Sequence, residues 1–135
     1  MRPQLEETGV RDSVTFSGLL RGPDVYEHLA AGELHVSPTL CEGLNMVTVE
    51  AAAAGTPTIS GDGAGIAAWL DRFQAGAVFP AGNAAALGDA IIAALAAPAR
   101  VAQWRDACSR MTEEFTLECV ADALERIMEP ADGSP

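Results

Sequence analysis

Two glutamates, Glu42 and Glu50, lie on either side of a predicted helix start and could together hold a sugar nucleotide. Between them, Gly43, Leu44 and Asn45 lead into an alanine-rich segment, with Asn45 as the candidate N-cap. The unpaired backbone N–H groups and the dipole of a helix N-terminus favour an anion such as a phosphate. Glu50 would lie about 7.5 Å further along the helix axis, where its carboxylate could accept hydrogen bonds from a ribose diol. This order predicts an acceptor for sugar hydroxyls, donors for phosphate and an acceptor for ribose.

The spacing of the two glutamates is weak evidence by itself. Glutamates eight positions apart (50 − 42 = 8) recur by chance, and Glu50 could be a solvated helix residue. Leu44 and Val49 are spaced to form a hydrophobic staple around the helix start, which supports the predicted N-terminus. The interpretation therefore depends on the elements that position this segment.

Short apolar runs alternate with helical stretches along the chain. Strands are predicted at residues 14–16, 34–37, 58–60 and 77–79. Glycine, proline and capping signals predict helices at residues 24–31, 45–54, 66–73, 84–96, 100–114 and 117–129, the last capped by Thr116. This alternation predicts an α/β fold with a mainly parallel sheet. Ligands of such folds bind beyond the carboxyl ends of the strands, where residues 38–45 and a flexible glycine-rich loop at 61–65 are the candidate loops.

Composition and charge narrow the classes of function. With 135 residues, of which 49% are hydrophobic, the chain should form one domain with a real core. A formal net charge of -11 disfavours nucleic acid and anionic membrane surfaces as partners. The sequence has no secretory signal and no run of ~18 apolar residues. Cys41, Cys108 and Cys119 lack metal-ligand spacing, which predicts reduced thiols in a cytoplasmic protein and no metal site. His28 and His35 are isolated, so we interpret both as structural residues.

Several motifs in this order resemble the C-terminal domain of the family-4 retaining glycosyltransferases, which have the GT-B architecture. The motifs cover roughly residues 14–128 and read VTFSG, LHVSPTLCEGL, EAAAAGTPTISGDGAGI, AGAVFPAGNAAALGDAIIAAL and FTLECVADALERIME. The second and third of them contain the pair of glutamates separated by seven residues that is typical of the family. The resemblance implies a partial Rossmann-like parallel sheet with flanking helices.

The resemblance also implies a role for each residue of the candidate site. Glu42 would contact hydroxyls of the transferred sugar and shape charge at the reacting carbon. Backbone groups around Gly43, Leu44 and Asn45 would hold sugar and phosphate, and Glu50 would bind the ribose diol. The reaction would pass a sugar from a nucleotide-diphosphate sugar to an acceptor hydroxyl with retention at the anomeric carbon, without a cofactor.

Two departures from the family pattern limit these expectations. The loop where relatives often carry Gly-Gly-x-x-Glu reads AGIAA at residues 64–68. The two βα units that would precede VTFSG and grip the diphosphate with Arg and Lys are not in this sequence, nor is the acceptor-binding N-terminal domain. We therefore expect residues 1–135 to form a single incomplete domain, with its core at 14–128 and a frayed tail at 130–135. We expect it to be inactive alone, with a complementary N-terminal chain as one candidate partner.

Two other functions stay open from the sequence. The chain could be a non-catalytic remnant or interaction module that pairs with another chain through an exposed sheet edge. It could also be another enzyme on the same scaffold, such as a sugar-nucleotide epimerase, because fold analogy alone does not exclude one.

Overall fold

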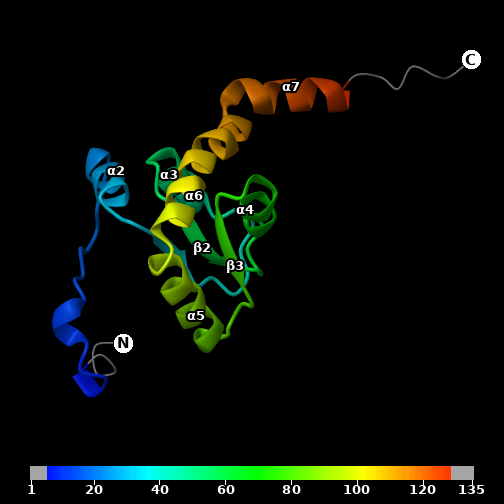
Figure 1. The fold of residues 1–135 in the computed structure, drawn as a ribbon. Helices are drawn as coiled ribbons and strands as arrows, with labels where there is room; N and C mark the ends of the chain where they lie inside the picture. The colour runs from blue at the N-terminus through cyan, green and yellow to red at the C-terminus, as the bar shows by residue number, and fades with distance from the viewer. Residues whose placement is uncertain (1–5, 129–135) are drawn as a thin grey trace, which may run out of the picture.

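A computed structural model of the protein describes residues 6–128, and its centre is a parallel sheet (Figure 1). Within those residues the sheet has three strands, β1 (His35–Ser37), β2 (Thr58–Gly61) and β3 (Gly76–Phe79), in the order β1-β2-β3. Val36 of β1 pairs with Ile59 of β2, which pairs with Ala77 of β3. The predicted α/β fold with a parallel sheet and flanking helices is confirmed.

Helices follow the strands and pack on the sheet. The helices are α2 (Pro23–Ala30), α3 (Met46–Ala53), α4 (Ala67–Phe73), α5 (Ala84–Leu95), α6 (Pro98–Thr112) and α7 (Leu117–Met128), with two short 3-10 helices, η1 (Arg11–Ser13) and η2 (Glu113–Phe115). Each predicted helix is present, although α6 begins two residues before the prediction because Pro98 occupies its first turn, where a missing N–H does no harm. The hydroxyl of Thr116 accepts a hydrogen bond from the Cys119 amide at 3.2 Å, so the predicted cap of α7 is confirmed.

The core contains many small and medium side chains together with the buried aromatic residues Phe79 and Trp104. One cluster joins α3, α4 and α6 through Leu70, Cys108 and Met111. A second cluster packs Ile59 and Phe79 of the strands against α5 and α6. Close contact of this kind suits an alanine-rich and glycine-rich sequence, because small residues let helices approach a sheet closely.

The strand predicted at residues 14–16 does not form. These residues follow η1 as extended chain and belong to no strand of the sheet. An extended segment gains ladder hydrogen bonds only from a neighbouring strand, so a strand-like sequence is insufficient without a neighbour. Together with α2 this arm lies beside the body, and α7 projects from the far end of α6 (Figure 1). The predicted tail at 130–135 lies outside the described residues.

No single helix within residues 6–128 is long and apolar enough to cross a membrane. Residues 84–95 and 98–115 reach that length and composition only as a pair bent by 97°. Several side chains of the second segment belong instead to the protein core, among them Trp104 and Met111.

Candidate functional site

The candidate site lies where the loops after β1 and β2 meet, at the carboxyl edge of the sheet. Glu42 forms an isolated parallel bridge with Ala64 beyond the ends of both strands. The Glu42 amide donates to the Gly63 carbonyl at 3.3 Å, and the Gly65 amide donates to the Glu42 carbonyl at 3.1 Å. The loop that carries Glu42 is therefore fixed through its backbone to the glycine-rich loop.

The glycines at 61–65 allow close backbone approach, whereas the sequence predicted a flexible loop. A Cβ added to Gly63 would lie 1.8 Å from the Leu40 carbonyl oxygen, and one added to Gly65 would lie 2.0 Å from the Gly43 carbonyl oxygen. Neither distance is possible for a real side chain, so these positions require glycine for packing. These contacts were not predicted from the sequence, because the partner segment, residues 40–43, is distant from the loop in the sequence.

A row of polar side chains connects the end of β1 to the Glu42 carboxylate. The side-chain amide of Asn45 donates to the Ser37 hydroxyl at 2.6 Å, and the Ser37 and Thr39 hydroxyls lie 3.2 Å apart. The Thr39 hydroxyl donates to Glu42 Oε2 at 3.4 Å. Because Thr39 has a single hydroxyl proton, Ser37 must donate to Thr39 when Thr39 donates to Glu42. All three donors then point toward Glu42, and bonds in such a row reinforce one another.

Asn45 occupies the predicted N-cap position of α3, but its side chain does not cap the helix. Asn45 precedes α3, but its φ of 63° places it in the left-handed region and its side chain accepts no hydrogen bond from the helix. Asparagine is one of the few residues that adopt this conformation readily. The side chain is buried and points back to Ser37, so it fixes the loop to the strand.

The hydrophobic staple at the start of α3 is supported by the packing. Val49 is buried in a cluster with Ala64 and Ile66, and Leu44 packs against that cluster. The staple therefore includes the loop after β2, which holds the helix N-terminus against both loops of the site.

The outward side of α3 carries the second glutamate. Thr48, Val49, Ala51 and Ala52 are the buried residues of this helix. Glu50 is half-buried and lies on the opposite face, about 6 Å along the axis from the first residue, Met46. Glu42 is exposed. The structure places Glu42 and residues 43–45 in one loop, and Glu50 lies one turn into the helix that follows.

Sequence reasoning missed Ser37 and Thr39. The signal was present as a group of short polar side chains at the carboxyl end of a strand, which ordinary loop composition also produces. What the sequence could not reveal is that Asn45 folds back over eight residues to complete the row.

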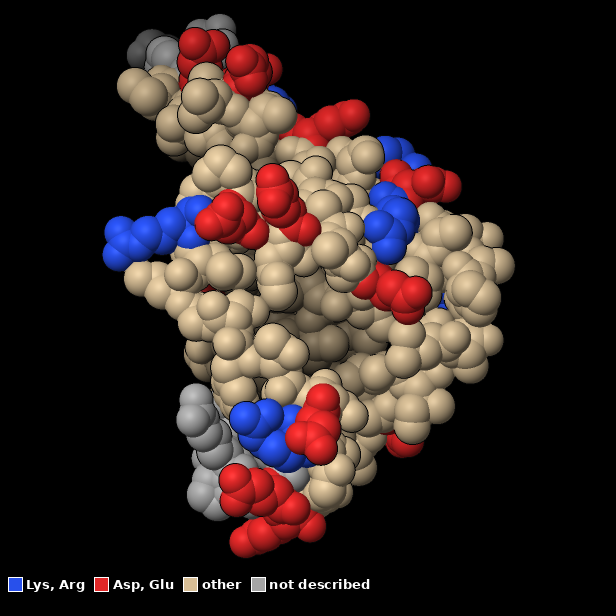
Figure 2. Space-filling model, turned by 90° about the vertical axis from the view of Figure 1, so that its left-hand side faces the viewer, with Lys and Arg blue, Asp and Glu red and all other residues tan. Residues whose placement is uncertain are grey.

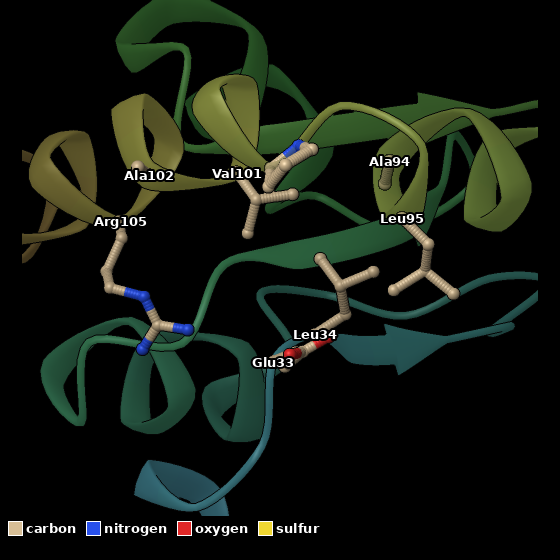
Figure 3. Close-up of a pocket in the computed structure, with 8 residues that line it drawn as sticks. Glu33, Leu34, Ala94, Leu95, Val101, Ala102 and Arg105 are labelled. Carbon is tan, nitrogen blue, oxygen red and sulfur yellow. The ribbon is translucent and has the colours of Figure 1, made fainter.

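One surface cavity lies near the candidate site, and another lies away from it. One cavity of about 140 Å³ lies at the carboxyl edge of the sheet and is lined by Pro38, Phe79, Gly82, Asn83, Ala84 and Leu87. Another, of about 210 Å³, lies at the opposite edge, where Leu34, Leu95 and Val101 point into one space beside Arg105 (Figure 3). On the face beside the N-terminal arm, acidic and basic side chains are scattered around a hollowed, largely uncharged centre (Figure 2).

The described part of the chain contains no cluster of three His, Cys, Asp or Glu residues that could hold a metal ion. All three cysteines are free thiols. Burial raises the pKa of the Cys108 thiol to about 11, which keeps this group protonated and unreactive.

Residues 1–97 match the family described as glycosyl transferases, group 1. This match covers well over half of the chain. The chain belongs to this family. No curated protein sequence is significantly similar to it.

Solved glycosyltransferase structures contain a closely similar fold. Sucrose-phosphate synthase from Thermosynechococcus elongatus is 27% identical, with a TM-score of 0.82 over 93% of this chain and 32% of that chain. HepE of Anabaena, crystallised with UDP, is 19% identical, with a TM-score of 0.82 over 93% of this chain and 35% of that chain. WaaG, a glycosyltransferase of lipopolysaccharide biosynthesis, is 23% identical, with a TM-score of 0.76 over 96% of this chain and 35% of that chain. The group 1 chain thus has the fold of GT-B glycosyltransferases and spans about a third of the length of these structures.

Proposed function

We propose that this chain is the donor-binding domain of a retaining glycosyltransferase, which passes a sugar from a nucleotide sugar to an acceptor hydroxyl. The observation that carries the proposal is the exposed Glu42 carboxylate, held by Thr39 at the carboxyl edge of the sheet beside the N-terminus of α3. Membership of the group 1 family supports the same reaction class.

Each part of the site then has a role in holding the donor. Glu42 contacts hydroxyls of the transferred sugar and stabilises positive charge that develops at the reacting carbon. Backbone groups of Gly43, Leu44 and Asn45 hold sugar and phosphate, helped by the dipole of α3. Glu50 accepts hydrogen bonds from the ribose diol. HepE has been crystallised with UDP and with UDP and glucose, so UDP-glucose is the first donor to test.

We further propose that this chain is cytoplasmic and has no transferase activity of its own. No Lys or Arg occurs between Arg21 and Arg72, the stretch that contains the whole candidate site. This stretch offers helix N–H groups but no cationic side chain to the two charges of a diphosphate, so a cationic clamp from elsewhere would complete the site. A complementary N-terminal chain would supply that clamp and the acceptor site.

Isothermal titration of the purified chain with UDP-glucose and with a guanosine diphosphate sugar tests donor binding. We expect millimolar binding of one donor, weakened by roughly tenfold or more in Glu50→Ala and in Glu42→Ala, which corresponds to about 1.4 kcal/mol. Asp89→Ala, an exposed carboxylate on α5, is the matched control and should bind as the parent does. Failure of the folded parent to bind either donor at millimolar concentration would refute the donor site.

The open edge of β1 favours a second function, a non-catalytic module that pairs with another chain. Among residues 6–128, β1 pairs with β2 alone, and a cavity of about 220 Å³ borders its other side. Because the His35 amide donates to Pro57 across the β2 side, the next amide along the strand, that of Val36, points to the open side. Hydrogen exchange of the Val36 amide, measured with and without an N-terminal portion of a group 1 enzyme, tests this. No protection on mixing would exclude the sheet edge as a pairing site.

A further inference from the structure

The hydrogen-bonded row that ends on Glu42 consists of Asn45, Ser37 and Thr39, and its first member is buried at the start of α3. The Asn45 amide nitrogen lies 2.6 Å from the Ser37 hydroxyl, which lies 3.2 Å from that of Thr39. Ser37 and Asn45 are 6% and 7% exposed, whereas Glu42 is exposed. The row therefore connects a carboxylate at the surface to two side chains that packing holds in place.

The carboxylate fixes the direction of every hydrogen bond in the row. An ionised carboxylate only accepts, so the Thr39 hydroxyl must use its one proton on Glu42. Thr39 then offers only lone pairs to Ser37, which must donate its own proton to Thr39 and accept from the next residue. That residue must present N–H groups, which the Asn45 side chain does and an aspartate of the same shape could not. Asn45 thus supplies the donor that the row needs at its buried end.

The row acts on the side chain of Glu42, because the backbone of this residue is fixed separately. The bridge to Ala64 holds the Glu42 backbone against the glycine-rich loop. An exposed glutamate on a fixed backbone still samples several rotamers, and a ligand that binds to it has to select one. The hydrogen bond from Thr39 selects a rotamer before a ligand arrives, and the carboxylate keeps the capacity to accept further hydrogen bonds.

Asn45 also belongs to the helix N-terminus at which we place the phosphate of the donor. It directly precedes Met46, the first residue of α3, while its side chain reaches back to Ser37 at the end of β1. The position of the Glu42 carboxylate relative to the N–H groups of α3 therefore depends on one residue. Because a single glycosidic oxygen joins sugar and phosphate, a preset separation of these two contacts favours the intact donor over the nucleotide alone.

We propose that Asn45 is a positioning residue, which acts through the row to hold the Glu42 carboxylate in one orientation for the transferred sugar. The identity of the ligand rests on the proposed function. The orientation of Glu42 exists in the free chain and can be measured there. Loss of the row should weaken the contact with the sugar and leave the contact with the nucleotide unchanged.

Nuclear magnetic resonance of the ligand-free chain at neutral pH tests the orientation. Vicinal couplings of the Glu42 side chain should show one dominant rotamer in the parent. Thr39→Val keeps the shape of the side chain without its hydroxyl, and Asn45→Asp cannot donate, so both should give averaged couplings. Thr39→Ser keeps the hydroxyl and should restore the dominant rotamer. Averaged couplings in the parent, or couplings that Thr39→Val and Asn45→Asp leave unchanged in folded chains, would overturn the proposal.

Isothermal titration with UDP and with UDP-glucose measures the consequence for the ligand. Thr39→Val should weaken UDP-glucose by roughly three- to tenfold, as expected for one hydrogen bond, and should not weaken UDP. In a Glu42→Ala background the same substitution should have no further effect, because no carboxylate is left to position. Equal losses for both ligands, or equal losses with and without Glu42, would mean that the row only stabilises the loop and would overturn the proposal. A folded parent that binds neither ligand would refute the proposed function, and the couplings would still decide the orientation of Glu42.

Discussion

Every buried residue within the described residues 6–128 lies between Ser37 and Met111, whereas the arm with α2 and the projecting α7 bury none. Both regions contain helices that begin with a side-chain cap or a proline, namely α5 and α6 in the centre and α2 and α7 outside it. In the central region those helices are held by packing. In α2 only Val25 and Leu29 are half-buried, and α7 leaves its apolar side chains exposed. Local sequence signals thus explain the helices of both regions, but only the central region has the contacts that give a helix most of its stability.

Removing a leucine side chain from each region is the strongest test of this difference. Leu70 is 1% exposed in the cluster that joins α3, α4 and α6. Leu70→Ala should lower the free energy of unfolding by roughly 2–5 kcal/mol, because it leaves a cavity. Leu117→Ala on α7 should change it by less than about 0.5 kcal/mol. Urea unfolding followed by Trp69 and Trp104 fluorescence measures both, and similar losses would mean that the two regions are equally packed.

Alanine substitutions at two glycines, Gly63 and Gly88, distinguish close packing from flexibility inside the central region. Gly63→Ala forces a Cβ against the Leu40 carbonyl, so we expect a loss of roughly 1–3 kcal/mol together with weaker donor binding. Gly88 of α5 has open space around its Cβ position. Gly88→Ala should raise stability by up to about 1 kcal/mol through its better helix propensity. If Gly63→Ala were as stable as the parent, the loop of residues 61–65 would be flexible, as the sequence suggested.

The sequence was sufficient to predict most elements because their boundaries are marked locally. Gly55 and Gly82 lie at turns with positive φ, and the predicted helices between the strands are all present. The failures share a different cause. Residues 14–16 need a neighbouring strand, Gly63 is required because of Leu40, and the Asn45 side chain is directed by Ser37. Each of these depends on a contact distant in the sequence, which composition and periodicity do not encode. The roles of Glu42 and Glu50 in ligand binding remain predictions.

The two asparagines at helix starts provide a smaller and more specific contrast. Asn83 caps α5 by accepting a hydrogen bond from the Ala86 amide at 3.0 Å, whereas Asn45 uses its side chain as a donor to Ser37. Asn83→Asp keeps the acceptor and adds a favourable charge at a helix N-terminus, so stability should stay within about 0.5 kcal/mol. Asn45→Asp removes the donor and should cost roughly 1–2 kcal/mol. Thermal unfolding of both variants at neutral pH measures the difference, and equal effects would mean that the Asn45 side chain caps α3 as Asn83 caps α5.

The smallest expected effect concerns His35 in β1, the strand at the border between the central region and the arm. Burial lowers the pKa of His35 below its ordinary value of 6.5, and Nδ1 of its ring lies 3.1 Å from Thr58 Oγ1. Because the folded state disfavours the protonated ring, the unfolded state binds more protons and stability rises with pH in this range. The contribution of His35 is therefore complete above about pH 6.5 and is lost as the pH falls below that value.

Urea unfolding between about pH 7.5 and about pH 5.5 measures this contribution before most carboxylates titrate. His35→Gln cannot be protonated, so its unfolding free energy should change less across the range. At pH 7.5 its unfolding free energy should be lower than that of the parent, because the substitution disturbs packing around β1. A smaller change of the unfolding free energy with pH indicates loss of a titrating group, whereas an equal lowering at every pH indicates loss of packing. A parent chain whose stability does not fall toward pH 5.5, or a His35→Gln variant with the parent's slope, would show that β1 is as open to solvent as the arm beside it.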